Sequence, residues 1–281
     1  MNPRPRIAVF GSVHMDLIAH AGTLPEKARS GMAHGFSMGL GGKGGNQAVE
    51  CAAMGAEAFM VTRLGGDEFG RSLLSSLQAR GVDCSGIEVA EDKQTGASTV
   101  LSSPEGYTSL IFPGAAAAMK MEDVGACVTA LAPLHMLLLQ LELPESLSVA
   151  AARAAKEMGA RVVLNASPPL AMNEELRQLL ALSDIVLVNE SEALALAGTA
   201  DVLAAAKVLN SIAVITRGAA GSSASDGETA WNEAAPAVAV RSTVGAGDAF
   251  LAGFCAGLCE MKDLPSALRA GTRAAARKLS S

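Results

Sequence analysis

The sequence predicts a single α/β domain over residues 1–281, with a mostly parallel β-sheet covered by helices on both faces. Half of the residues are hydrophobic, which is enough for a large core, and one α/β domain can reach this length. Short apolar runs rich in strand-forming residues alternate with segments of helical pattern, which is typical of βαβ units. We expect strands at 7–10, 58–64, 134–141, 161–165, 184–188 and 212–216, and helices at 46–54, 68–80, 145–158, 174–182 and 201–209.

Two stretches with strand and turn character, 13–38 and about 86–113, interrupt this alternation. The second contains an expected hairpin, in which 97–103 and 108–112 flank a turn that includes Pro104 and Gly106. Strands inserted between the units of a parallel sheet predict a small β lid, although a surface hairpin without function would give the same pattern.

The composition argues against several classes of protein. The net charge is −6 without a basic block, whereas nucleic-acid binding usually needs a basic face. The sequence shows no N-terminal signal pattern and no apolar stretch of membrane-spanning length. Its five cysteines are an odd number without metal-ligand spacing, which fits a reducing compartment. We therefore expect a cytoplasmic protein without a nucleic-acid or membrane partner.

The most informative motif is TVGAGDAF at residues 243–250. It follows an apolar run at 237–240, so we expect a strand, a tight glycine turn and then the start of a helix. Glycines allow close approach of the backbone, and the first N–H groups of a helix form an anion site. An acid there would repel a phosphate, but it makes sense as a base that takes a proton from a hydroxyl. The alternative is that Asp248 only favours the helix dipole.

A second glycine-rich stretch, GLGGKGGNQA at residues 39–48, formally matches the dinucleotide fingerprint. We reject that interpretation because no convincing core strand precedes it. A Walker motif is rejected as well, since Ser37 occupies the place of its first glycine and Gly44 that of its Ser or Thr. The glycines instead predict a loop that passes close to a polyol.

These two stretches and several shorter motifs occur in an order that resembles the ribokinase-like (phosphofructokinase B) family of sugar kinases over nearly the whole chain. The shorter motifs lie at 11–16, 64–70, 139–142, 165–168, 189–192 and 216–218. The resemblance implies a ribokinase-like three-layer α/β/α sandwich, with a lid that covers the sugar and pairs two subunits into a homodimer. It also implies transfer of a phosphoryl group from ATP, with Mg²⁺, to a small sugar, foremost D-ribose to give D-ribose 5-phosphate.

The resemblance assigns two groups of residues to this reaction. The catalytic group is the base Asp248 with the anion hole of Gly245, Ala246 and Gly247. The sugar group consists of Ser12, His14, Asp16, Gly42, Lys43, Asn46 and Glu142. The residues themselves support two of these roles, because a carboxylate such as Asp16 can accept from vicinal hydroxyls, and an unpaired charge at Glu142 after an apolar strand would be costly outside a pocket. A solvated loop acid remains the alternative for Asp16.

The nucleotide end is assigned in the same way. By resemblance the nucleotide contacts Asn165, Asn189, Thr216, Gly218 and Gly221, and the ion Mg²⁺ is held through water by Asn189 and Glu192. The spacing of Asn189 and Glu192 also matches a helix capping box, and both interpretations can hold together. Asn165 could equally serve turn chemistry.

Three features depart from the family pattern. His14 stands where an Asn is expected, so another small sugar or a nucleoside remains an alternative substrate. Ser242 replaces an Asp of the monovalent-cation site, and the sequence ends soon after Arg277, where family members continue with further cation ligands. We therefore do not expect potassium activation, and a sugar- or nucleotide-binding protein with little kinase activity remains the second alternative.

Overall fold

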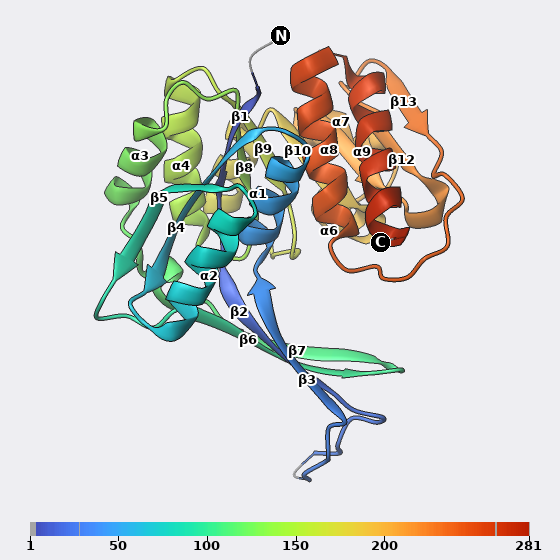
Figure 1. Cartoon of the computed structure of the whole chain (residues 1–281). Helices are drawn as coiled ribbons and strands as arrows, with labels where there is room; N and C mark the ends of the chain where they lie inside the picture. Colours follow the sequence, from blue (N-terminus) through green and yellow to red (C-terminus); the bar gives the residue numbers. More distant parts are fainter. Residues whose placement is uncertain (1–3, 28, 262, 281) are drawn as a thin grey trace.

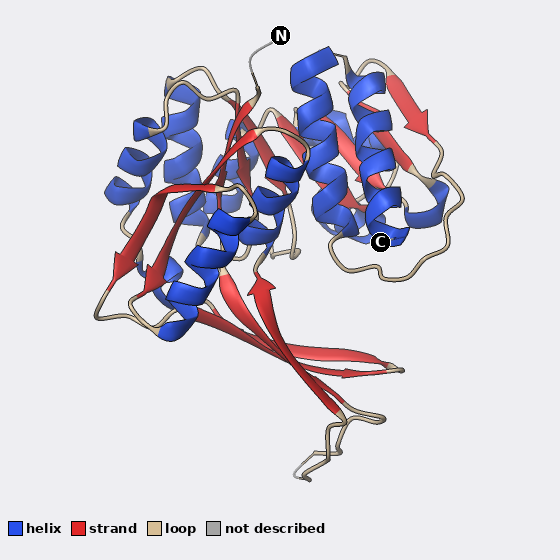
Figure 2. Ribbon diagram, in the orientation of Figure 1, coloured by secondary structure: helices blue, strands red, loops and turns tan. Residues whose placement is uncertain are grey.

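The computed structural model describes residues 4–27, 29–261 and 263–280, and over these residues nine strands form one large sheet (Figures 1 and 2). Their spatial order is β13 (Ala230–Glu233), β12 (Ser222–Ser225), β11 (Ile212–Thr216), β10 (Ile185–Asn189), β9 (Arg161–Asn165), β8 (Met136–Leu139), β1 (Arg6–Phe10), β4 (Glu57–Gly65) and β5 (Asp83–Ala90). The pairs from β11 to β5 are parallel, and β12 and β13 add antiparallel pairs at one edge. The expected mostly parallel sheet is confirmed.

Helices cover both faces of this sheet because the strands are apolar on both sides. In β1, Ile7 and Val9 join one buried cluster, whereas Ala8 and Phe10 join the other. The first layer contains α1 (Lys43–Ala53), α2 (Glu68–Ala79), α8 (Ala246–Met261) and α9 (Leu264–Ser280). The second contains α3 (Met121–Ala130), α4 (Glu145–Glu157), α5 (Glu174–Leu182), α6 (Glu190–Ala197) and α7 (Val202–Leu209). The result is the expected α/β/α sandwich. No helix in the described part of the chain is long and apolar enough to cross a membrane.

A small sheet projects from the body of the molecule, at the lower side of Figure 2. Its spatial order is β3 (Gly35–Gly41), β2 (His14–His20), β6 (Gly96–Ser103) and β7 (Gly106–Phe112). Laterally paired residues share a face of a sheet, so the register shows which side chains lie together. One face is mainly apolar and carries Phe36, Met38, Leu101, Leu110 and Phe112. The other face is mixed and carries His14, Asp16, Ser37, Ser98 and Ser109 together with Ile18, Val100 and Ile111.

Two sequence expectations differ from the structure. The expected strand at 237–240 is wrong: this segment is an irregular loop in which Val240 is 60% exposed. β13 already occupies the edge of the sheet, and Pro236 has no N–H to continue a ladder. The stretch expected from about residue 86 to supply lid strands begins inside β5, which pairs with β4 in the large sheet. Two short 3₁₀ turns complete the described elements, Gly114–Ala118 and Gly218–Ala220.

Candidate active site

Polar side chains gather where the parallel strands end, as expected for ligand sites in open α/β sheets. Ser12 follows β1, and both Gln140 and Glu142 follow β8. Asn165, Asn189 and Thr216 are the last residues of β9, β10 and β11, and Asn189 lies directly beside Thr216 in the sheet. Because neighbouring parallel strands end at one edge, residues more than 200 positions apart in sequence meet at this site.

A cavity of about 230 Å³ lies at this edge and brings the predicted phosphate-side residues together. It is lined by Lys43, Asn165, Ser167, Leu187, Asn189, Glu192, Thr216, Gly245, Gly247 and Asp248. Gly245 has φ 76°, a left-handed conformation that favours glycine, and α8 begins directly after it. The first N–H groups of α8 have no partner within the helix, so this end of the cavity suits an anion.

A second cavity of about 270 Å³ adjoins the first, since Thr216 and Gly247 line both. Its walls are mainly apolar and come from the turn between β11 and β12, the loop after β13, α8 and α9: Gly218, Gly221, Ala235, Pro236, Thr243, Ala246, Phe250, Thr272, Ala275, Ala276 and Leu279. All five sequence-predicted nucleotide residues thus line one of two connected cavities, one polar and one apolar. Such a pair matches the phosphates and the base of a nucleotide.

Asp248 lies in the first turn of α8, where protein atoms surround most of its carboxyl group. This burial raises the pKa of Asp248 to about 6. A hydrogen bond from Gln47 and the positive charge of Lys43 act to lower it, and the carboxylates of Glu142 and Glu50 act to raise it. The balance leaves an acid that is mostly ionised at neutral pH, yet more basic than an ordinary aspartate, as a general base requires.

Glu142 fixes the start of α1. Its Oε2 accepts a hydrogen bond from the hydroxyl of Ser12 and another, at 2.8 Å, from the backbone N–H of Lys43. The preceding Gly42 has φ 89°, and a Cβ there would lie 2.5 Å from the carbonyl oxygen of Ser12. A glycine is therefore required, and the half-buried carboxylate of Glu142 caps the first N–H of α1. The predicted role of Glu142 toward the sugar stays a prediction.

The remaining sugar-side residues lie toward the small sheet. Nε2 of His14 lies 3.2 Å from Oδ1 of Asp16, and Asp16 lies over Gly41, where a Cβ would be 2.3 Å from its carboxylate. His14 is 4% exposed, and its Nδ1 has no hydrogen-bond partner within the described part of the chain. Asn46 is half-buried in α1. His14 and Asp16 thus form a polar pair beside the start of α1.

Asn189 and Glu192 form the capping box that their spacing predicts. Oδ1 of Asn189 accepts from the N–H of Glu192 at 2.9 Å, and Oε2 of Glu192 accepts from the N–H of Asn189 at 2.8 Å. Both residues also line the polar cavity. Over residues 4–27, 29–261 and 263–280, no three His, Cys, Asp or Glu side chains gather to hold a metal ion directly. Oxygen donors that act through water suit Mg²⁺, which keeps part of its hydration shell.

Sequence reasoning missed several residues that complete the site. Gln47 donates to Asp248 at 3.0 Å, and Gln140 donates to Gln47 at 2.6 Å. Nζ of Lys278 lies 2.7 Å from Oε1 of Glu50, and the Lys278 side chain passes beside Gly245. Gln47 and Gln140 lie inside motifs that were recognised, but their pairing across the fold leaves no local signal in the sequence.

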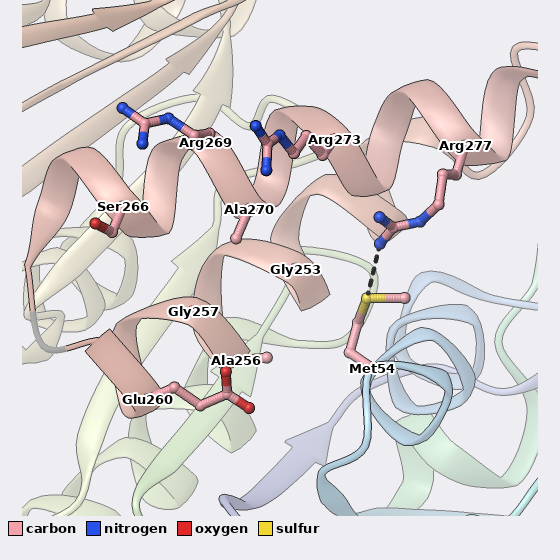
Figure 3. Close-up of a pocket in the computed structure, with 10 residues that line it drawn as sticks. All are labelled: Met54, Gly253, Ala256, Gly257, Glu260, Ser266, Arg269, Ala270, Arg273 and Arg277. Atoms are coloured by element: carbon pink, nitrogen blue, oxygen red, sulfur yellow. Dashed lines mark hydrogen bonds between the residues drawn. The ribbon is translucent and has the colours of Figure 1, made fainter.

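A further hollow of about 340 Å³ lies between α8 and α9 near Met54, and Figure 3 shows the three arginines of α9 that line it. Nη2 of Arg277 lies 3.6 Å from the sulfur of Met54, and Nε of Arg269 lies 3.5 Å from Glu233. The nucleotide-sized cavity uses different residues of α9, including Thr272 and Ala276. None of the sequence-predicted site residues lines the hollow of Figure 3, so this hollow does not belong to the candidate active site.

A polar cavity suited to an anion, an acid with a raised pKa on its wall and an adjoining apolar cavity fit a phosphotransferase that acts on an alcohol. Comparison with known proteins supports this class. The pfkB family of carbohydrate kinases matches residues 4–281, so the chain belongs to this family and is a sugar kinase.

Individual relatives agree with the family. Ribokinase of Haemophilus influenzae is 30% identical over 97% of this chain and 92% of its own length. Deoxyribokinase of Salmonella typhi is 30% identical over 94% of this chain and 89% of its own length. The structure of Arabidopsis thaliana ribokinase complexed with ribose and ATP superposes with a TM-score of 0.85 at 27% identity, covering 99% of this chain and 93% of that one.

Proposed function

We propose that this chain is a ribokinase that transfers the γ-phosphoryl group of ATP to D-ribose, giving D-ribose 5-phosphate and ADP. The observation that carries the proposal is Asp248, an acid with a raised pKa in the first turn of α8, on the wall of a cavity suited to phosphate. A carboxylate in such a place does not help to bind an anion. It is explained when it accepts the proton of the hydroxyl that attacks the phosphoryl group.

The chemistry follows from this placement. The hydroxyl oxygen of the sugar bonds to the γ-phosphorus, its proton passes to Asp248, and the bond to the bridging oxygen breaks so that ADP leaves. The N–H groups at Gly245, Ala246 and Gly247 and the ammonium of Lys43 stabilise the charge on the transferring group, so catalysis is mainly positioning and electrostatics. Mg²⁺, held through water by Asn189 and Glu192, would neutralise phosphate charge when bound.

Each substrate has its own part of the site in this proposal. The apolar cavity bounded by Phe250, Ala276 and Leu279 takes the nucleotide base, and the polar cavity takes the phosphates. Asp16, His14 and Asn46 take the sugar hydroxyls, and the face of the small sheet that carries His14 and Asp16 serves as a lid. The five cysteines of the chain are free thiols, which fits a cytoplasmic enzyme that meets ATP there.

A coupled assay of ADP release across a sugar panel tests the function. We expect the highest kcat/KM for D-ribose and lower values for 2-deoxy-D-ribose, D-fructose and adenosine. 2-Deoxy-D-ribose is the second candidate, because His14 presents an imidazole in place of an amide and a deoxyribokinase is equally similar. Highest activity on that sugar would replace the proposed substrate. Absence of ADP release with every sugar, in a folded protein that binds ATP, would favour a binding protein.

We also propose that two copies associate through the small sheet. Its apolar face carries Phe36, 65% exposed, and Leu110, 80% exposed, in line with Met38, Leu101 and Phe112. Isolated monomers rarely leave such a contiguous apolar face in water. Light scattering after size exclusion should give twice the chain mass, and Leu110→Glu should give the monomer mass, with Ser109→Glu on the opposite face as the control. A monomeric wild type would contradict the proposal.

A further inference from the structure

Two buried glutamines connect the end of β8 to Asp248. Nε2 of Gln140 donates to Oε1 of Gln47 at 2.6 Å, and Nε2 of Gln47 donates to Oδ1 of Asp248 at 3.0 Å. Gln47 is 0% exposed and Gln140 is 2% exposed. Burial of amides this complete is costly unless each has a specific partner. The arrangement therefore needs an explanation beyond packing.

We call the two hydrogen bonds from Gln140 to Gln47 and from Gln47 to Asp248 the glutamine relay. The order of donors and acceptors gives this relay a direction. An amide has one carbonyl oxygen and one NH₂ group, so Gln47 can turn only one of them toward Asp248. Because Gln140 donates to its Oε1, Gln47 presents Nε2. The opposite direction would place Oε1 of Gln47 against the carboxyl group, a contact that only protonated Asp248 could satisfy. The observed direction matches an ionised acid.

The turn after β1 sets the place of Gln140. Its Oε1 is buried without a hydrogen-bond partner among the described residues. The same atom lies 1.9 Å from the point where a Cβ on Gly11 would lie, so any larger residue at position 11 would displace the amide. The glycine of the 11–16 motif thus makes room for the first member of the relay.

We propose that Gln140 and Gln47 are positioning residues that keep Oδ1 of Asp248 as a hydrogen-bond acceptor, so that the proton of the attacking hydroxyl goes to Oδ2. This inference rests on the proposed function, in which Asp248 is the base. As the hydroxyl oxygen bonds to the γ-phosphorus, its proton moves to Oδ2, and the electrons of the breaking bond leave with ADP. Gln47 and Gln140 act through Asp248 and do not contact the substrate.

The charged and titratable groups around Asp248 come from three elements and are left unchanged in the test. They are Lys43, Glu50 and Cys51 of α1, Glu142 after β8, and Lys278 of α9, which pairs with Glu50. Burial raises the pKa of the Cys51 thiol to about 12, so this thiol stays neutral through the pH range of interest. A difference in the pKa of Asp248 between variants therefore reports the loss of hydrogen bonds from the relay.

The test compares Gln47→Met, Gln140→Met and the double variant with wild type, because Met keeps the length of Gln without its amide. Carbon NMR of ¹³C-labelled aspartate reads the pKa of Asp248, whose signal is assigned by its loss in Asp248→Asn. A hydrogen bond to the charged form lowers a pKa, so Gln47→Met should raise that of Asp248 by about one unit. Gln140→Met should raise it less, because Gln47 keeps its NH₂ group but loses its fixed direction.

The pH dependence of kcat should show the same shift in the pKa of Asp248. In Gln47→Met and in the double variant, the acid limb of kcat against pH should move upward by the same amount as the pKa, with little change in sugar KM. The double variant leaves no orphaned amide and should unfold closer to the wild-type temperature than Gln47→Met. Thr62→Val is the control: Thr62 is fully buried, its hydroxyl has no partner within the described residues, and neither readout should move.

Two results would overturn the proposal, and they are distinguishable. An unchanged pKa of Asp248 in Gln47→Met shows that the relay does not act on the carboxyl group, whatever the base is. A pKa that rises while the kcat profile stays in place shows that Asp248 is not the base, and the proposed function then fails together with the positioning role.

Discussion

The buried groups around Asp248 and the small sheet are built in opposite ways. Around Asp248, the side chains of Gln47 and Gln140 are buried, and side-chain hydrogen bonds join them to Asp248 and hold the start of α1. In the small sheet, β7 is exposed along its whole length and contacts only β6 laterally. Under the proposed function, the buried groups would hold the reacting atoms and the lightly supported sheet would bind the sugar.

The largest effect among the buried groups is expected for Asp248→Asn. We expect kcat to fall by on the order of 10²–10⁴-fold, because the amide cannot accept the hydroxyl proton. The KM values for sugar and ATP should change little. Asp201→Asn is a matched control, since Asp201 caps α7, lines neither of the two cavities, and Asn caps equally well. Near wild-type kcat in Asp248→Asn would show that Asp248 is not the base.

The corresponding test of the small sheet is Asp16→Ala. Loss of a charged hydrogen bond to a hydroxyl costs about 1.5–3 kcal/mol, so the sugar KM should rise about ten- to hundredfold. The ATP KM should stay within error of wild type. Ser109→Ala, on the same face of the sheet, provides the control. Equal effects on both substrates would show that Asp16 does not belong to the sugar side alone.

The pH dependence of the free energy of unfolding should distinguish Asp248 from an acid that only stabilises the fold. The folded pKa of Asp248, about 6, exceeds its ordinary value, so the folded state holds this proton more tightly and ionisation above pH 6 opposes folding. Asp248→Asn should therefore raise the free energy of unfolding by about 1–2 kcal/mol at pH 8, with the gain vanishing below about pH 4. Urea unfolding across pH measures this. A destabilised Asn variant at pH 8 would contradict it.

Asp67 provides the opposite case. Burial alone would raise the pKa of Asp67, but hydrogen bonds from Thr95 and Gly70 hold it below the ordinary value. Its contribution to stability is present above the ordinary pKa and is lost as pH falls through the folded value. Asp67→Asn should therefore destabilise the protein at neutral pH, and the deficit should shrink in acid.

The smallest effect is expected for potassium. Ser242 is exposed and offers a hydroxyl where a carboxylate would anchor a monovalent cation. Replacement of K⁺ by a large organic cation at constant ionic strength should change kcat little, and Ser242→Asp should introduce a dependence on K⁺. Saturable, many-fold activation of the wild-type enzyme by KCl would show that backbone carbonyls suffice.

The sequence predicted the parallel core and the family because these depend on local patterns. Strands such as β9 and β10 are short apolar runs, and Asn189 with Glu192 carries its helix cap in its spacing. The run at 237–240 has the same apolar character, but it follows Pro236 and joins neither of the two described sheets, which only the assembled structure reveals. The pairing of Gln47 with Asp248 was missed for a related reason, since no local pattern encodes contacts between distant residues.

Three long-range side-chain contacts of α1 bear on how the chain folds during its synthesis. Gln47 meets Gln140 and Asp248 at separations of 93 and 201 residues, and Glu50 meets Lys278 at a separation of 228. Contacts of such long range form late, because a large loop must close before they stabilise anything. A nascent chain that still lacks α8 and α9 has His14, Asp16 and Asn46 but not Asp248, the proposed base, or Gly247 of the proposed anion hole. Under the proposed function, partly made chains therefore cannot consume ATP before these two helices have docked.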